Sequence, residues 1–489
     1  MIFVAIAITA FALSVAMVDV RKGLVALLLI GVLQDVLRKL TPDVPAYYIL
    51  WSLATFLVIA AVAARRGLIA PLRTLVLGDG TLKALWTLMA FLIAAQFVHS
   101  FVRWGPVVPT LGAIEYLVPL LAVLLGAGFA RRFPDLRWFL KWYVFIVGPA
   151  ALSVFASVRF GDRFPVLRDV GTFTGTELII YDRWGVTLQS YSGLFRTGEI
   201  AAWHAATAAV FVLILARRGA ARGWWFAIPG VVLLVGAIVY TGRRKMLMAL
   251  TLFFVLRLIL DFLAARGLGR RSGVALIVAL AIAMLPGLLP ETDDYLNRGV
   301  SVYNSLGERS GTALDLARSA MYRSGGIGLG VGVFSQGSRY AGVDLQSVVG
   351  GAGEAGVGKI ILEFGIAGLL LLALIVGRTI IKGWRLMRWM GRRRDPALLV
   401  TIAIGSFLVG QVATFVVATQ IYGDPFVLII LGLTIGFLFG KLSAAERMRM
   451  AEVRTKGAVR HGAANGRQGV TYPRGSRVGG FSAAPADRR

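Results

Sequence analysis

The chain has 489 residues, of which 57% are hydrophobic and only 16% are charged, and its mean hydropathy is +0.75. These values exclude a soluble domain, which would need more polar side chains to face water. The net charge is +27. Most lysines and arginines lie in short segments between apolar runs, which favours membrane orientation and contact with anionic lipids over nucleic acid as a partner. The absence of cysteine excludes disulfides, thiolate metal sites and cysteine nucleophiles.

Long apolar stretches recur along the chain, and each can cross about 30 Å of hydrocarbon as a helix. The sequence therefore predicts an all-α polytopic membrane protein, with a bundle of about 12–13 transmembrane helices over residues 1–440. The N-terminal run lacks an early cation and a cleavage site, so it is interpreted as a span. Residues 67–78 are too short to span and are predicted to lie in the interface. The predicted spans are residues 2–18, 23–39, 46–64, 84–102, 107–129, 138–157, 198–216, 224–241, 246–263, 273–290, 357–381, 396–420 and 425–440.

Basic residues in short connections predict the orientation of these spans. With alternating spans they fall on one side, which the positive-inside rule makes cytoplasmic. Residues 441–489, with eleven Lys or Arg against three acids, are predicted to be a basic disordered tail on that side. The connections that set this orientation contain Arg65, Arg66, Arg131, Arg132, Arg137, Arg217, Arg218, Arg222, Arg266, Arg270, Arg271 and residues 382–394.

Two long loops, about 158–197 and 291–356, then fall on the extracytoplasmic side, where such proteins concentrate function. The turn YTGRRKM at 240–246 faces the same side, although Arg243, Arg244 and Lys245 oppose the charge bias. Arginine forks and a lysine match phosphate oxygens. The alternative interpretation is contact with ordinary phospholipid headgroups, or snorkelling at a helix end.

Further charged residues flank these features. The larger loop carries Arg298, Arg309, Arg318, Arg323 and Arg339, which would form either an anion clamp or the polar face of an amphipathic lid. At the end of the smaller loop, Arg196, Glu199 and His204 enter a span. Arg196 and Glu199 are three apart, so a structural ion pair is one interpretation. For His204 the favoured interpretation is a structural histidine inside the membrane.

Three segments resemble the bacterial O-antigen ligase and O-antigen polymerase superfamily over roughly residues 190 to 380. They are SGLFRTGEIAA at 192–202, YTGRRKMLMAL at 240–250, and a Gly-rich loop end followed by LEFGIAGLLL at 362–371. The family commonly carries a histidine nine residues before the glutamate of the last motif. Here that position, counted back from Glu363, is Glu354. Glu354 either replaces the histidine as base, belongs to a polymerase-type member with different chemistry, or pairs with an arginine or Lys359.

The resemblance implies a multi-pass protein of the bacterial inner membrane with its active site on the extracytoplasmic face. It implies glycan transfer from a polyprenyl-diphosphate-linked donor to a glycan or to lipid A-core. Arg243, Arg244 and Lys245 would bind the diphosphate, with Arg196 and one or two of Arg309, Arg318 and Arg323. Glu354 would be the catalytic base and Glu199 the alternate. No cofactor or metal is expected, because the cations replace a metal and the chain lacks an Asp-x-Asp motif.

Two other classes remain open. A lipid-linked oligosaccharide flippase or polysaccharide exporter also has twelve to fourteen spans, but no two-fold internal repeat is evident here. A peptidoglycan glycosyltransferase of the shape-and-division type would carry a loop aspartate motif that this sequence does not show. The sequence does not separate ligase from polymerase.

Overall fold

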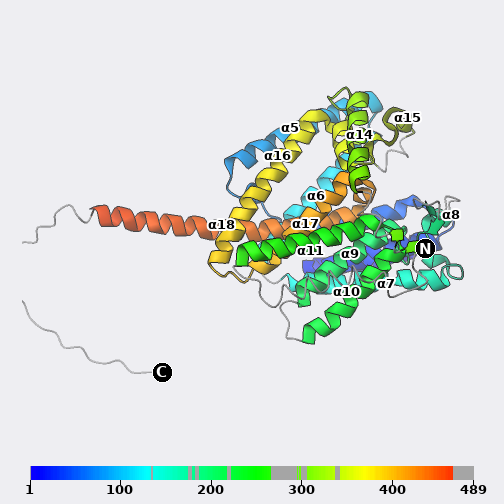
Figure 1. The fold of residues 1–489 in the computed structure, drawn as a ribbon, viewed down its shortest axis with the longest axis horizontal. Helices are drawn as coiled ribbons and strands as arrows, with labels where there is room; N and C mark the ends of the chain where they lie inside the picture. Colours follow the sequence, from blue (N-terminus) through cyan, green and yellow to red (C-terminus); the bar gives the residue numbers. More distant parts are fainter. Residues whose placement is uncertain are drawn as a thin grey trace, which may run out of the picture. The chain divides into compact units, whose positions relative to one another are not determined.

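The computed structural model describes residues 2–133, 136–173, 179–181, 187–216, 222–265, 294–295, 297–298, 306–335 and 342–465. Helices dominate these residues (Figure 1), and eight of the described helices are long and apolar enough to cross a membrane. The protein is therefore an all-α polytopic membrane protein, as the hydropathy pattern predicts. The chain divides into two compact units, Met1–Ala444 and Ala445–Arg489.

Twelve of the predicted spans correspond to described helices, and the predicted span 273–290 lies outside the described residues. Even residues 23–39, which carry several charges, belong to a continuous helix. The helices are α1 (Ile2–Val18), α2 (Val20–Leu40), α3 (Trp51–Arg65), α5 (Gly80–Trp104), α6 (Val107–Arg132), α7 (Arg137–Phe160), α9 (Gly198–Ala216), α10 (Arg222–Tyr240), α11 (Arg244–Ala265), α16 (Gly356–Arg392), α17 (Leu398–Val417) and α18 (Pro425–Asn465).

The connections contain short elements. The segment predicted to lie in the interface holds a single helical turn, and the smaller loop contains a two-stranded antiparallel hairpin that the sequence did not predict. Its strands are three residues each, too short for a period-two pattern to be read. These elements are η1 (Ala46–Leu50), α4 (Arg73–Val76), η2 (Pro165–Leu167), α8 (Val170–Phe173), β1 (Ile179–Tyr181), β2 (Thr187–Gln189), α14 (Leu306–Ser324), α15 (Leu345–Val349), η6 (Gly350–Gly353) and η7 (Gln420–Gly423).

Helix α9 forms the centre of the largest core and packs against α7 and α10. Nearly all of its residues are buried, which suits a helix that is apolar on every face. Small residues bring α6 and α18 into close contact, because a Cβ at Gly436 would lie 2.2 Å from the Val123 carbonyl oxygen. This core fixes the start of α9, where the motif at 192–202 enters the bundle.

A non-helical segment, residues 325–334, packs against α5, α6 and α16. Gly328, Gly330 and Gly332 have φ values of 103°, 108° and 90°, which only glycine adopts readily. Buried side chains of α5 satisfy its backbone: Gln96 Nε2 donates to the Ile327 carbonyl at 2.8 Å and Ser100 Oγ to the Val331 carbonyl at 2.8 Å. Irregular backbone inside a membrane bundle is stable only when its polar groups are paired in this way.

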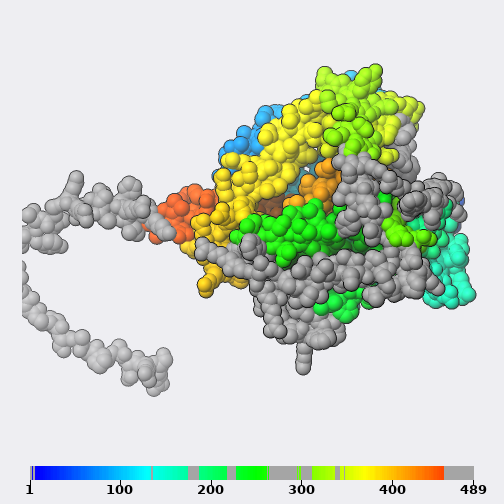
Figure 2. Space-filling model, viewed as in Figure 1, coloured from blue at the N-terminus to red at the C-terminus, as the bar shows by residue number. Residues whose placement is uncertain are grey.

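Helix α16 lies beside α5 and α14 (Figure 1). It bends at Gly365, where φ is 70° and ψ is −169°. The freed amide of Ile366 donates to the Gly326 carbonyl at 2.9 Å, so the bend and the Gly-rich segment stabilise each other. Figure 2 shows the surface hollowed between α16 (yellow) and α11 (green), with α17 (orange) visible inside.

The prediction of a disordered tail from residue 441 is wrong for its first part, because α18 continues to Asn465. The residues after Ser443 include Ala, Glu, Arg and Met, which are strong helix formers. Arg449 also pairs with Glu446 one turn away at 3.0 Å. Residues 466–489 lie outside the described residues.

The two predicted loops and the turn at 241–245 lie at one end of the bundle, called the loop end below. Ser190 Oγ in the smaller loop donates to the Thr241 carbonyl at 3.1 Å. In the larger loop, the Glu354 carbonyl accepts from the Thr419 amide at 2.9 Å, just before η7. The alternation of spans therefore brings together the segments that carry the candidate residues.

Candidate functional site

Arg196 lies just before α9, within the motif at 192–202, and its guanidinium is buried between two carboxylates. Its Nη2 lies 2.6 Å from Asp424 Oδ2, and its Nη1 lies 3.7 Å from Asp35 Oδ1. Its backbone amide also donates to Asp35 Oδ2 at 3.1 Å. This set of three residues, the Arg196 anchor, ties the smaller loop to α2 and to the start of α18. Because two carboxylates already face its guanidinium, Arg196 fits a structural role better than a phosphate site.

The interpretation of Arg196 and Glu199 as an ion pair does not match the pairs that the structure describes. Glu199 instead pairs with Lys245, and both side chains are 12% exposed. The physical reason is local: α9 begins at Gly198, so Arg196 lies outside the helix and the three-residue spacing does not place the two side chains on one face. Glu199 and Lys245 therefore join the start of α9 to the turn at 241–245.

Arg243 and Arg244 are half-buried in that turn, here called the cationic turn. The Nε atom of Arg243 is buried without a hydrogen-bond partner among the described residues. Burial lowers the pKa of Arg243, and the nearby Asp169 carboxylate partly offsets this. Even so, arginine stays protonated in proteins. Among the described residues, the Arg243 guanidinium therefore keeps hydrogen-bonding capacity for an anion, and Arg244 lies next to it in the same turn.

Asp169 links the smaller loop to the same turn. Burial raises its pKa, and hydrogen bonds from the amides of Gly171 (3.0 Å) and Gly198 (3.1 Å) oppose that shift. Arg298 also reaches the turn, where its Nε donates to the Gly242 carbonyl at 3.1 Å. Among the residues that the structure describes, the three cations of the turn and Arg298 lie near two acids, Glu199 and Asp169.

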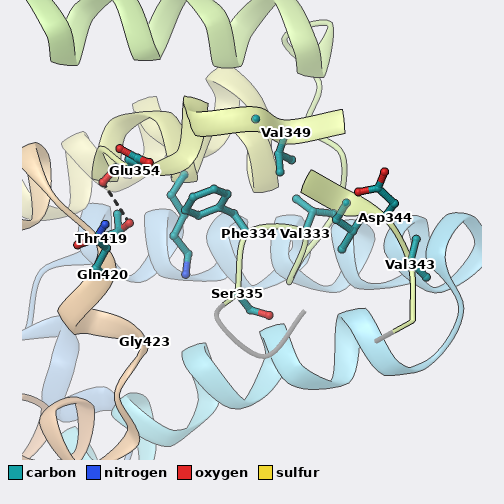
Figure 3. Close-up of a pocket in the computed structure, with 13 residues that line it drawn as sticks. Val333, Phe334, Ser335, Val343, Asp344, Val349, Glu354, Thr419, Gln420 and Gly423 are labelled. Atoms are coloured by element: carbon teal, nitrogen blue, oxygen red, sulfur yellow. Dashed lines mark hydrogen bonds between the residues drawn. The ribbon is translucent and has the colours of Figure 1, made fainter. Parts of the chain in front are cut away.

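Glu354 lines a separate cavity of about 530 Å³. Its side chain is exposed, while its carbonyl oxygen accepts hydrogen bonds from Thr419 (Figure 3). Figure 3 shows Phe334 in the middle of the lining residues, with Glu354 on one side and Asp344 on the other. The residues that line this Glu354 cavity are Val333, Phe334, Ser335, Val343, Asp344, Leu345, Val349, Gly350, Glu354, Lys359, Thr419, Gln420 and Gly423.

The other candidate arginines do not join the cationic turn in contacts that the structure describes. Arg318 is exposed, lies 3.5 Å from Asp315, and lines a second cavity beside Tyr322. The Nη1 atom of Arg323 donates to the Val348 carbonyl at 2.8 Å, so this side chain holds the end of α15. Arg309 lies in α14, and its side chain is outside the described residues.

The short segment 419–424 connects the Glu354 cavity with the Arg196 anchor. Thr419, Gln420 and Gly423 line the cavity, and the next residue, Asp424, pairs with Arg196. Asp424 also begins α18, because its Oδ1 accepts from the Val427 amide at 2.7 Å. The cavity and the motif at 192–202 are therefore supported by one rigid connection.

Sequence reasoning missed a buried charged group below the cavity. Lys359 forms an ion pair with Glu115 of α6, and Glu363 lies fully buried one turn further along α16. The signal was present as a Lys and a Glu four residues apart in an otherwise apolar helix. His204 is buried, and its Nδ1 lies 2.7 Å from the Tyr143 hydroxyl, in accordance with the structural interpretation.

No protein-family model and no curated protein sequence matches this chain. Among the residues that the structure describes, no three His, Asp or Glu side chains are grouped so as to hold a metal ion. The candidate functional site consists of two polar features at the loop end, the cationic turn and the Glu354 cavity.

Proposed function

We propose that this protein is a membrane glycosyltransferase that takes a glycan from a polyprenyl-diphosphate-linked donor, as an O-antigen or exopolysaccharide polymerase or ligase. The observation that carries the proposal is the presence of a cationic turn and of a cavity lined by Glu354 and Asp344 at the same end of a membrane bundle. The resemblance of residues 190 to 380 to the O-antigen superfamily supports it. The resemblance also implies a bacterial inner membrane, and the positive-inside rule favours the extracytoplasmic face for the loop end.

In this proposal, an acceptor hydroxyl attacks the anomeric carbon of the donor. The bond from that carbon to the diphosphate oxygen breaks, and the new glycosidic bond forms. Negative charge grows on the leaving diphosphate, and preorganised cations stabilise it most where water is excluded. Arg243 and Arg244 supply that charge without a metal. Glu354, exposed in the cavity, accepts the hydroxyl proton.

Opposite charges at the two features support separate positions for the two substrates. A diphosphate is attracted to the cationic turn, whereas the acids Glu354 and Asp344 in the cavity disfavour it and suit sugar hydroxyl groups. The hollow between α16 and α11 lies between the helix that begins at the cationic turn and the helix that begins beside the cavity (Figure 2). A lipid-linked donor needs a lateral approach of this kind.

The test uses purified protein in detergent with a polyprenyl-diphosphate-linked glycan and an acceptor. Arg243→Ala with Arg244→Ala should lower kcat by at least about 100-fold, as for removal of other oxyanion-stabilising donors. The matched control is Arg385→Ala with Arg388→Ala, which removes two exposed arginines near the opposite end of α16. Equal activity of wild type and the Arg243/Arg244 variant would reject the clamp.

An exporter or flippase is the second candidate, and one observation favours it. Charged residues buried in a bundle, such as Glu115, Lys359 and Glu363, are typical of proton-coupled transporters. Glycan transfer in detergent separates the two classes, because transport has no meaning there. Absence of product for every donor and acceptor pair, together with substrate movement in proteoliposomes, would favour the exporter.

A further inference from the structure

Four polar side chains from two helices meet below the Glu354 cavity. Lys359 of α16 pairs with Glu115 of α6, and the neighbouring Tyr116 hydroxyl donates to Glu363 Oε2. The other oxygen of Glu363 accepts from the Phe334 amide at 3.3 Å. Lys359 and Phe334 also line the cavity, so Lys359 connects the buried set directly to the cavity.

Among the described residues, the surroundings of Glu363 offer little compensation for its negative charge. The ionisable groups that interact with Glu363 are Lys359, Glu115 and Tyr116. The Gly-rich segment contributes only the Phe334 amide among the hydrogen bonds described to Glu363. The adjoining cluster is apolar: α5 contributes Leu92 and Ile93, and α17 contributes Phe415.

Glu363 is fully buried and forms no ion pair with a cation among the described residues. Its two carboxylate oxygens accept from the Tyr116 hydroxyl and from the Phe334 amide, which are both neutral donors. An uncompensated charge in an apolar interior costs several kcal/mol, and such groups commonly take up a proton instead. The geometry allows this at Glu363, because a tyrosine hydroxyl can accept a hydrogen bond as well as donate one.

We propose that Glu115, Tyr116, Lys359 and Glu363 form a buried binding site for one exchangeable proton, and that Lys359 connects this site to the Glu354 cavity. The Lys359 ammonium gives a proton to the Glu363 carboxylate and regains one from a hydroxyl or water in the cavity. One O–H bond breaks in the cavity and one O–H bond forms on Glu363, which neutralises the Glu363 carboxylate.

This site goes beyond glycan transfer, because it can exchange a proton in either class of protein considered above. In a transferase it would be the final acceptor of the proton released by the attacking hydroxyl. In a transporter it would couple movement of the cargo to the proton gradient. Its test therefore uses a readout that does not depend on any substrate.

Infrared difference spectroscopy of the purified protein during a pH titration distinguishes a neutral carboxylic acid from a carboxylate. We expect a carboxylic acid band that disappears in Glu363→Gln and persists in Glu354→Gln, the control in the cavity. Tyr116→Phe should shift the frequency of that band, because it removes a hydrogen bond and keeps the acid. A spectrum unchanged in both Glu363→Gln and Tyr116→Phe would overturn the proposal.

A second experiment tests the connection through Lys359. Lys359→Arg keeps the positive charge beside Glu115 but cannot release a proton at accessible pH, so exchange of the Glu363 proton with D₂O should slow by about tenfold or more. The infrared band reports this rate, and thermal unfolding in detergent checks that the variant is folded. Exchange as fast as in the wild type would show that the proton reaches Glu363 by another route.

Discussion

The Arg196 anchor and the Glu354 cavity lie at the same end of the bundle, yet they use their charges in opposite ways. In the anchor, the guanidinium of Arg196 and the carboxylates of Asp35 and Asp424 are all nearly buried and face one another. In the cavity, the Glu354 side chain is exposed and faces an open space of about 530 Å³. The first arrangement fixes the fold, and the second leaves a charge free to act on a ligand.

The comparison teaches that a charged residue near a membrane motif is informative only once its partners are known. Arg196 and Glu354 were both candidates from the sequence, on the same motif evidence. Removing a charge should lower stability in the anchor and lower activity in the cavity. The substitutions below test that division, in order of decreasing expected effect.

The largest effect is expected for Asp424→Ala. It leaves Arg196 buried without its nearest carboxylate, and breaking a buried ion pair costs about 3–5 kcal/mol of unfolding free energy. The measurement is reversible unfolding in mixed detergent micelles, followed by circular dichroism. Asp424→Asn is the matched control, because asparagine still caps α18 and isolates the loss of charge. If neither variant loses about 1 kcal/mol or more, the anchor does not fix the fold.

The spans could be predicted from sequence because an apolar run that is long enough to cross the hydrocarbon core is recognisable without any knowledge of its partners. The same alternation placed the two long loops and the turn at 241–245 at one end of the bundle. Their partners could not be predicted, because the backbone amide of Arg196 meets Asp35 across 161 residues and no local pattern records that contact. The continuation of α18 was missed because low apolar content was taken for disorder, although the residues themselves favour helix.

The cavity itself had only one predicted member, Glu354. Its walls come from the Gly-rich segment, from residues 343–350 and from residues 419–423, which are separate in sequence. Positive φ values at alternate glycines shape the first wall. In the sequence, those glycines indicate only that regular helix is interrupted, and they do not predict the path of the backbone. The buried charges of Lys359 and Glu363 were visible as residues but not as a pair with Glu115 and Tyr116.

Glu354→Gln should have the next largest effect, this time on activity. Loss of a general base lowers kcat by roughly 100-fold, or about 2.7 kcal/mol in the barrier. The KM for the donor and the unfolding free energy should stay nearly constant, because the side chain is exposed. Glycan transfer kinetics measure kcat and the KM for the donor. Asp315→Asn, an exposed acid elsewhere in the larger loop, is the control and should retain wild-type kcat.

Lys245→Met should have an intermediate effect, because its pair with Glu199 is less buried than the anchor. We expect a loss of about 2 kcal/mol in unfolding free energy, since Glu199 would keep its charge without its partner. Combining Lys245→Met with Glu199→Gln should restore part of that loss, because both charges are then removed. Losses that simply add in the double variant would show that the pair does not join the turn to α9.

Arg318→Ala is expected to have the smallest effect, and it sharpens the contrast between paired, buried cations and solvated ones. The side chain is 80% exposed, and its pair with Asp315 spans one turn of α14, so the unfolding free energy should change by less than about 0.5 kcal/mol. The KM for the donor should also stay within about twofold, because no donor-binding energy is lost if the clamp lies at Arg243 and Arg244. A large rise in the KM for the donor would indicate that the diphosphate binds at the second cavity, beside Tyr322, and not at the cationic turn. Arg243 and Arg244 would then be positioned like Arg196, as cations that hold the loop end together.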